Sequence, residues 1–208
     1  MQEYVSNPLL LKKRKFHIRV YVLAVNDVSV YVYDEVLILC SGSKYKKHDT
    51  SDAISHITNT AYQAMDPNFR EEDCVLLMRD MEKILAGQRV GGSARGEKES
   101  GRICASILSE IRSITGELFK AYRNETSVYA PIDGCFEYYG LDFLVDDAFN
   151  VTLLEVNPSP DFKQTGKKLN FVIEGLLEES IDIGLGSNDK YNDENRMWQC
   201  VFEEKRIR

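Results

Sequence analysis

The sequence lacks the features that place a protein in or across a membrane. No stretch approaches about 18 apolar residues, so neither a membrane-spanning helix nor a membrane partner is expected. The opening residues Met1-Gln2-Glu3-Tyr4 lack the basic and apolar regions of a secretory signal. These absences favour a cytoplasmic or nuclear protein, and we predict a cytoplasmic one.

The chain also lacks the cysteine and glycine patterns of several common sites. Its five cysteines are widely spaced and contain no Cys-x-x-Cys, which argues against a disulfide framework and against a zinc site. No Gly-x-Gly-x-x-Gly or Walker loop is present, and no Ser-His-Asp order or Cys-His pair indicates a nucleophile. We therefore expect reduced thiols and a fold other than the Rossmann sheet.

Positive charge is in the minority. The 26 Lys and Arg residues face 33 Asp and Glu residues, which gives a formal charge of -7. Such a charge argues against general affinity for nucleic acid, and we expect no direct nucleic-acid partner. A length of 208 residues suffices for one well-buried domain, or for one domain with a small added lobe.

A strong β pattern is present near the start of the chain. Three apolar, β-branched runs cover Phe16 to Val25, Val28 to Tyr33 and Val36 to Leu39. The turn signal Asn26-Asp27 separates the first two runs, and Asp34-Glu35 separates the second from the third. This pattern predicts three strands of an antiparallel meander.

Helical spacing of apolar residues follows in three places. It predicts helices over residues 71–85, about 102–122 and about 166–183. The composition of the remaining segments predicts a loop over 41–52, a flexible linker over 87–101, a polar stretch over 184–195 and a short closing element within 197–202. Strands, helices, a hairpin and a further helix make an α+β fold.

Two apolar runs around residues 140–158 carry acids and an amide, which are depleted in strand interiors. If Asp147 to Asn150 form a four-residue hairpin turn, Asp142 lies opposite Glu155. Asn157 shares a face with Glu155, because side chains two apart point the same way. Hard oxygen ligands of this kind hold Mg²⁺ together with substrate phosphates. The alternative is a surface hairpin whose polar residues face water.

Three further segments carry polar groups at informative spacing. The opening segment Gln2-Glu3-Tyr4-Val5 is either an edge that presents backbone groups to a nucleotide base or an ordinary edge strand. Lys15 and Arg19 share a strand face with His17 between them, which suits polyphosphate or carboxylate binding or is simply a solvated face. The segment His56-Ile57-Thr58-Asn59 is either a helix N-cap or a phosphate or substrate contact.

Taken together, these fragments resemble the tubulin–tyrosine ligase family. The resemblance rests on Gln2-Glu3-Tyr4-Val5, Arg14-Lys15-Phe16-His17-Ile18-Arg19, His56-Ile57-Thr58-Asn59 and Leu153-Leu154-Glu155-Val156-Asn157. Order and spacing agree across about residues 2–183, and the likeness is greatest to divergent fungal members, some of which are associated with cytoplasmic mRNA-decay bodies. The family has an ATP-grasp fold. The resemblance therefore implies an ATP-dependent carboxylate–amine ligase that extends a protein tail, typically of tubulin, through an acyl phosphate.

The resemblance also implies roles for single residues. Gln2, Glu3, Tyr4 and Val5 match the adenine hinge, Lys15 matches a phosphate or ribose contact, and Arg19 matches a cation at the reacting carboxylate or phosphate. His56, Ile57, Thr58 and Asn59 match a loop on the ribose and substrate side. Asp142, Glu155 and Asn157 match the Mg²⁺ ligands.

Three departures from the family pattern stand out. His17 occupies a position where the family usually has Asp, so it counts here as a nucleotide-side residue of altered chemistry. The family's usual Arg after the third strand falls near Leu39 and Cys40, so one substrate-binding cation is missing. The chain also begins inside the adenine hinge, so we expect residues 1–186 to be the C-terminal portion of an ATP-grasp domain and 187–208 to be a polar tail.

Three hypotheses follow. The first is a ligase that uses ATP and Mg²⁺ and is incomplete without its N-terminal half. The second is a catalytically inactive member of the family that binds protein partners, for example in an mRNA-decay assembly. The third and weakest is a metal-dependent phosphohydrolase that uses the same acids.

Overall fold

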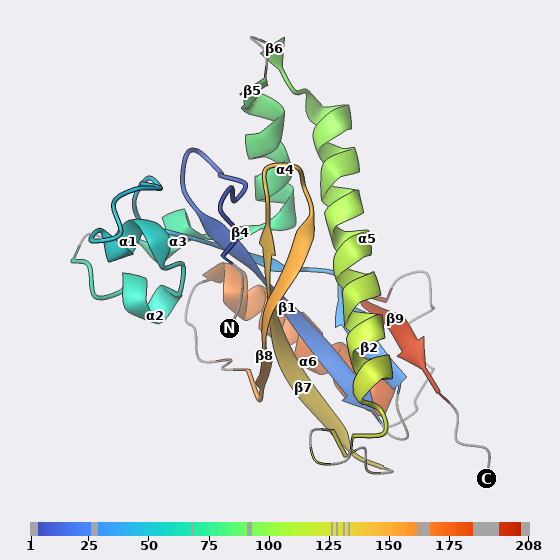
Figure 1. Cartoon of the computed structure of the whole chain (residues 1–208). Coiled ribbons are helices and arrows are strands. Elements are labelled where there is room, and N and C mark those ends of the chain that lie inside the picture. Colours follow the sequence, from blue (N-terminus) through green and yellow to red (C-terminus); the bar gives the residue numbers. More distant parts are fainter. Residues whose placement is uncertain are drawn as a thin grey trace. The chain divides into compact units, whose positions relative to one another are not determined.

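The computed structural model describes most of the chain (Figure 1). The described residues are 4–25, 29–67, 69–90, 93–125, 127, 129–130, 132, 134–160, 162, 167–184 and 196–204. Three expectations concern residues outside these ranges: the hinge residues Gln2 and Glu3, the turn at Asn26-Asp27, and most of the polar stretch 184–195. No described helix is both long and apolar enough to cross a membrane.

The chain forms two compact units, which we call unit 1 and unit 2. Unit 1 comprises Met1–Arg19, Val36–Ser109 and Asp142–Leu154. Unit 2 comprises Val20–Glu35, Glu110–Leu141 and Glu155–Arg208. Four long elements contribute residues to both units: β1 (Phe16–Val25), β7 (Phe136–Val145), β8 (Val151–Pro158) and helix α5 (Glu97–Tyr122).

Unit 1 is built on the first part of β1. Phe16 to Arg19 pair antiparallel with β3 (Leu37–Cys40), and β3 pairs with β4 (Val75–Leu77). Every β1 side chain except that of Arg19 is buried, as expected for a β-branched and aromatic strand. The other elements of unit 1 are α1 (Ala53–His56), α2 (Thr60–Gln63), α3 (Glu71–Cys74), α4 (Met78–Gly87), β5 (Arg89–Val90) and β6 (Ser93–Ala94).

Unit 2 is built on the second part of β1. Val22 to Val25 pair with β2 (Ser29–Tyr33), and β2 pairs with β9 (Trp198–Glu203), a short strand where the sequence predicts a short closing element. Helix α6 (Lys167–Gly184) lies close to the predicted bounds. Trp198 is buried against Tyr33, with ring centroids 5.0 Å apart, and its indole N–H donates to the Leu176 carbonyl at 3.3 Å.

The predicted meander is wrong. A meander places the third strand beside the second, but β3 pairs with β1 along Phe16 to Arg19 while β2 pairs with β1 along Val22 to Val25. The physical reason is that β9, from the end of the chain, occupies an edge of β2. Such a long-range pairing is absent from the local sequence pattern.

The predicted helix over residues 71–85 is also wrong in its middle. Val75 to Leu77 form β4, with all three side chains buried, because this apolar segment gains hydrogen bonds along the edge of β3. Tertiary pairing therefore overrides the helical spacing. The spacing itself persists in α4, which buries Met78, Met81 and Leu85.

The predicted linker over 87–101 contains regular structure. Strands β5 and β6 pair within it, and α5 begins at Glu97, five residues before its predicted start at Arg102. Gly96 has a φ of 86° just before the helix, a conformation that glycine adopts readily. Acidic side chains in the first turn, Glu97 and Glu99, interact favourably with the helix dipole, so this glycine-rich, charged composition is compatible with a helix start.

Candidate functional site

Unit 1 contains a buried ion pair. Arg19, from β1, forms a fork on Asp142, from β7: Nε donates to Oδ1, and Nη2 donates to Oδ2 at 2.9 Å. The exposed fractions of the two side chains are only 15% and 7%. Two parallel charge-assisted bonds fix both the position and the rotamer of the carboxylate.

His17 lies beside this pair. It is two residues from Arg19, so both side chains lie on the same face of β1, as the sequence predicts. Its Nδ1 is 2.6 Å from the Thr58 hydroxyl, and its Nε2 is 3.7 Å from Asp142 Oδ1. The structure therefore brings four of the predicted residues together: His17, Arg19, Thr58 and Asp142.

A second group of predicted residues lines a hollow of about 430 Å³ in unit 1. The lining includes Tyr4, His56 and Ile57. The Lys15 ammonium lies 5.2 Å from the centre of the Tyr4 ring, within the range of a cation–π contact. Lys15 directly precedes β1 instead of lying inside it, and its ammonium lies over the Tyr4 ring.

Tyr45, which the sequence analysis does not single out, supports this hollow. Its hydroxyl is 3.1 Å from that of Tyr4, and its ring packs edge-on against His56, with centroids 5.1 Å apart. Burial, together with the Tyr4 hydroxyl, raises the pKa of Tyr45 to about 12, so this phenol stays protonated. No local sequence signal marks Tyr45, because it meets Tyr4 only in the folded unit.

The loop from His56 to Asn59 is held by specific hydrogen bonds. The Asn59 side chain accepts from the Tyr62 N–H at 3.1 Å and caps α2, as one of the two predictions for this segment states. The His56 Nε2 donates to the Asp49 carbonyl at 3.0 Å. The buried Gln63 side chain donates to the Ile57 carbonyl and accepts from the Gly42 N–H at 2.8 Å. Gln63 is therefore a positioning residue that the sequence analysis missed.

The turn between β7 and β8 is shorter than predicted. The Asp146 N–H donates to the Asn150 carbonyl at 3.0 Å, which leaves three residues between them, and Phe149 adopts a left-handed φ of 69°. The predicted alignment of Asp142 opposite Glu155 assumes a four-residue turn and loses that support. Asp142 belongs to unit 1, whereas Glu155 and Asn157 belong to unit 2, so the proposed magnesium set stays a prediction.

The chemistry of the three predicted ligands suits a hard cation. The Asn157 amide N–H donates to Glu155 Oε1 at 3.1 Å. The Asn157 amide oxygen and the second Glu155 carboxylate oxygen are then the atoms that can bind a cation. A carboxylate has about four lone-pair sites, so Asp142 retains acceptor capacity beside the Arg19 fork. Among the described residues, no group of three His, Cys, Asp or Glu side chains forms a metal site. This finding does not test a set of two acids and one amide.

The hinge segment is anchored to β7. The Leu9 N–H donates to the Val145 carbonyl at 2.8 Å, and the Asp147 N–H donates to the Asn7 carbonyl at 2.9 Å. Tyr4 and the half-buried Val5 precede this anchored stretch. The roles predicted for the hinge therefore stay predictions, with only these two of its four residues described.

Comparison with known proteins identifies relatives of this chain. A sequence model of the tubulin-tyrosine ligase family matches residues 1–192. The chain is 38% identical to the probable tubulin–tyrosine ligase C12B10.04 of Schizosaccharomyces pombe, covering 89% of this chain and 41% of the relative. It is 36% identical to the probable tubulin–tyrosine ligase PBY1 of Saccharomyces cerevisiae, covering 87% of this chain and 23% of the relative. The chain thus spans less than half the length of either relative.

A solved structure shares the fold. The C-terminal domain of Pby1 from K. lactis, described as an ATP-grasp enzyme that interacts with the mRNA decapping enzyme Dcp2, matches with a TM-score of 0.72 and 29% identity. The match covers 98% of this chain and 52% of that one. The predicted α+β fold, the C-terminal part of an ATP-grasp unit, is thereby confirmed, as is the resemblance to divergent fungal members. The chain belongs to the tubulin-tyrosine ligase family.

Proposed function

We propose that this chain is the C-terminal part of an ATP-dependent carboxylate–amine ligase that joins an amino acid to a protein tail. The observation that carries the proposal is the Arg19 fork on Asp142, with His17 and Thr58 beside it. A buried, bidentate ion pair that involves two predicted site residues holds a cation and a carboxylate in fixed positions. Phosphoryl transfer depends mostly on such positioning and on charge neutralisation.

The residues of unit 1 fit a nucleotide in type and charge. The hollow lined by Tyr4, His56 and Ile57 offers apolar and aromatic walls, with Lys15 as a point charge at the Tyr4 ring. In this proposal the hollow and Lys15 hold ATP, while Asp142, Glu155 and Asn157 hold Mg²⁺. Bound ATP would supply the phosphoryl group that activates the substrate carboxylate, with Mg²⁺ neutralising phosphate charge.

His17 sets this chain apart from the family pattern that the sequence analysis describes. The His17 ring is directed at Asp142, with Nε2 3.7 Å from that carboxylate, so an aspartate at this position would direct a second, shorter acidic side chain toward it. Two carboxylates directed at one site repel each other, and a bound cation offsets that repulsion. With His17 the predicted metal set has two carboxylates and no third, so we expect weaker Mg²⁺ binding than an aspartate would give. The change His17→Asp is expected to strengthen Mg²⁺ binding.

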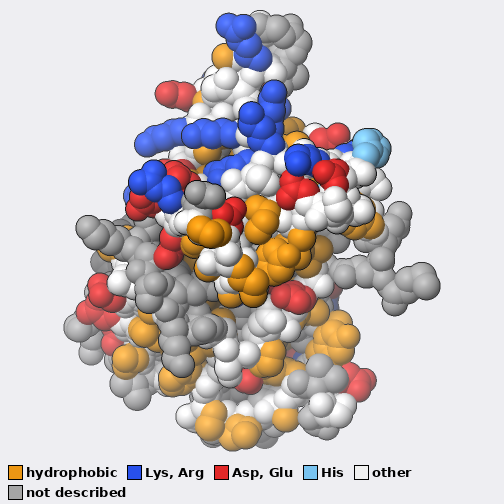
Figure 2. Space-filling model, turned by 90° about the vertical axis from the view of Figure 1, so that its left-hand side faces the viewer, with side chains coloured by type: hydrophobic (Ala, Val, Ile, Leu, Met, Phe, Trp, Pro, Cys, Tyr) orange, Lys and Arg blue, Asp and Glu red, His pale blue; other side chains and the backbone are white. Residues whose placement is uncertain are grey.

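The charge distribution favours unit 1 as the side that meets an acidic protein tail. Unit 1 contains 14 acidic and 15 basic residues, whereas unit 2 contains 19 acidic and 11 basic residues. Lys12 and Lys13, next to the predicted site residues in the sequence, are exposed. Lys and Arg side chains also gather on one part of the surface in Figure 2. An acidic tail is attracted to such a region and is repelled by unit 2.

Amino-acid transfer tests this function directly. The protein tested is this chain extended by the part of the protein that corresponds to the unmatched length of its relatives. It is incubated with Mg·ATP, a peptide with an acidic tail, and Tyr, Glu or Gly. Intact-mass spectrometry is expected to show addition of one of these amino acids, and Glu155→Gln is expected to abolish it. A well-folded, ATP-binding protein that modifies no acceptor with any of the three would refute the ligase assignment.

Two observations support a second candidate function. The related K. lactis domain is described as interacting with Dcp2, and His17 replaces the usual family acid. We therefore keep a non-catalytic, protein-binding role in cytoplasmic mRNA decay as the alternative. It predicts that Glu155→Gln leaves both the fold and the cellular role intact, whereas the ligase proposal predicts loss of the role with the fold retained.

A further inference from the structure

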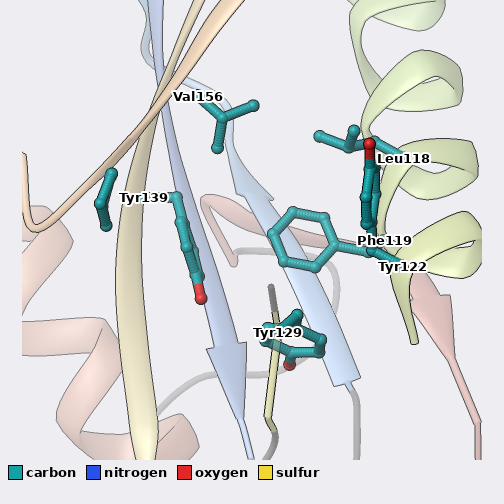
Figure 3. Close-up of a pocket in the computed structure, with 7 residues that line it drawn as sticks. Leu118, Phe119, Tyr122, Tyr129, Tyr139 and Val156 are labelled. Carbon is teal, nitrogen blue, oxygen red and sulfur yellow. The ribbon is translucent and has the colours of Figure 1, made fainter. Parts of the chain in front are cut away.

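Unit 2 contains an aromatic hollow that the proposed ligase site does not use. Its volume is about 380 Å³, and its walls come from the end of α5, from β7 and β8, and from the segment that precedes β7 (Figure 3). The lining residues are Leu118, Phe119, Tyr122, Tyr129, Tyr139, Val156 and Pro158. No lining residue carries a formal charge, and a volume of this size accommodates a large side chain.

Three rings form one wall of this hollow. Phe119 packs edge-on against Tyr129 and Tyr139, with centroids 5.4 and 5.3 Å apart, so these rings hold one another in place (Figure 3). By contrast, Tyr122 and Val156 are 42% and 38% exposed. The hollow is therefore a preformed aromatic surface that is open to solvent, and such surfaces usually mark interaction sites.

The hollow and two of the predicted metal ligands, Glu155 and Asn157, lie on opposite faces of β8. Val156 and Pro158 line the hollow, and they alternate along the strand with Glu155 and Asn157. Side chains of neighbouring strand residues point to opposite faces. A ligand in the hollow therefore lies on the other face of the strand from Glu155 and Asn157, and the inference does not depend on the proposed ligase activity.

A carboxylate lies next to the aromatic wall. The Tyr139 hydroxyl donates to Glu137 Oε2 at 2.6 Å, and Glu137 itself is exposed. Burial of the phenol and, to a smaller extent, its hydrogen bond to Glu137 raise the pKa of Tyr139. Within the described part of the chain, no Lys, Arg or His forms an ion pair with Glu137. Glu137 thus offers negative charge to a ligand.

A second hollow adjoins the first. It measures about 220 Å³, and Tyr129 lines both hollows. The second contains Glu137 together with the exposed side chains of Ile132 and Phe136. An apolar site and an acidic site therefore share one tyrosine as a wall, so two nearby residues of an extended peptide can occupy both.

We propose that these two hollows form a docking site for an extended, basic segment of a partner protein. An aromatic or leucine side chain enters the hollow between α5 and β8, and a Lys or Arg within three residues of it binds Glu137. Charge complementarity supports this occupant, because unit 2 has 19 acidic and 11 basic residues. The same charge disfavours nucleic acid and acidic tails, so the docking partner is chemically unlike the acidic tail in the proposed ligase function.

The experiment is selection from a random-peptide phage library on the folded chain without nucleotide. The selected peptides are then made with a fluorophore, and their affinities are measured by polarisation. Tyr122→Ser and Glu137→Gln are the test variants, since both side chains are exposed and their loss should leave the fold intact. Phe171→Ser and Glu174→Gln, both exposed on α6 in the same unit, are the matched controls. Circular dichroism checks the folding of all four variants.

We expect the selected peptides to combine an aromatic residue or leucine with a nearby Lys or Arg. Each test variant is expected to weaken binding by about tenfold or more, the usual effect of losing an anchor contact, while the controls change it by less than about twofold. The proposal is overturned if no peptide is enriched, if the enriched peptides are acidic, or if the test variants bind as tightly as the controls.

Discussion

Replacing Arg19 by methionine is expected to destabilise the chain strongly, because it leaves the Asp142 carboxylate buried without its main partner. The Asp142 side chain is 7% exposed and receives two charge-assisted bonds from Arg19. The reverse change, Asp142→Leu, leaves the Arg19 guanidinium buried without this carboxylate. The two substitutions are therefore expected to destabilise the chain for the same reason, since each removes one charge of the same buried pair.

The magnitude follows from the burial of both charges. Breaking a buried ion pair by removing one partner costs about 3–5 kcal/mol. A domain of this length loses about 2–4 °C of melting temperature per kcal/mol, so either single variant is expected to melt about 10 °C lower. The double variant Arg19→Met, Asp142→Leu is expected to lose less than either single variant, because apolar replacement of a whole buried pair is often close to neutral.

Urea unfolding followed by circular dichroism measures all three variants as a double-mutant cycle. The exposed pair of Lys120 and Glu117, 3.3 Å apart, is the matched control, and Lys120→Met is expected to cost less than about 1 kcal/mol. If the two single losses simply add in the double variant, or if each is as small as the control, the central role of this ion pair is refuted.

Three further changes test other parts of the fold. Gly116→Ala is expected to cost about 1–3 kcal/mol in urea unfolding, because a Cβ there would lie 2.7 Å from the Val201 carbonyl oxygen, whereas Gly87→Ala meets nothing within 4 Å and is the control; equal effects of the two would contradict the contact. Lys12 and Lys13 hold left-handed φ angles of 51° and 66° in a tight turn, so Lys12→Asn with Lys13→Gly is expected to raise the unfolding free energy by about 1 kcal/mol or more, and a loss would show that the turn is not strained. Burial raises the pKa of Glu179 despite a hydrogen bond from the Met197 N–H, so the folded chain binds that proton more tightly than the unfolded chain. The free energy of unfolding is therefore expected to fall as pH rises from about 4, the ordinary pKa of Glu in the unfolded chain, to the raised pKa in the folded chain. Glu179→Gln should weaken this pH dependence of the melting temperature, and an unchanged pH dependence would exclude Glu179 as its source.

The sequence predicts most clearly those elements whose pattern is local. Strand β1 and the β7–β8 hairpin follow from runs of β-branched and aromatic residues, and α6 follows from apolar spacing. Strand β4 was missed because three apolar residues fit a helix or a strand equally well, and only the free edge of β3 decides between them. The strand order near β2 depends on β9, which lies far away in the sequence.

The candidate site shows the same difference between relations that are local in the sequence and relations that only the fold creates. Spacing along β1 correctly places His17 and Arg19 on one face, because that relation is local. That Arg19 pairs with Asp142 does not follow from either segment alone, since the sequence analysis assigns one to substrate and the other to metal. Tyr45 and Gln63 are ordinary loop and helix residues until the fold brings them to the hollow and to the His56 loop.

Calorimetric titration of Mg·ATP tests the central claim most directly. The protein is the chain extended by the segment that the relatives carry, compared with its Asp142→Asn and Glu155→Gln variants. The exposed position of Glu155 makes its variant the one that separates metal binding from folding. We predict Mg²⁺-dependent ATP binding by the unchanged protein and about a hundredfold loss in both variants. Binding that is equal in all three proteins, or absent from all three, would contradict the assignment of a nucleotide and metal site.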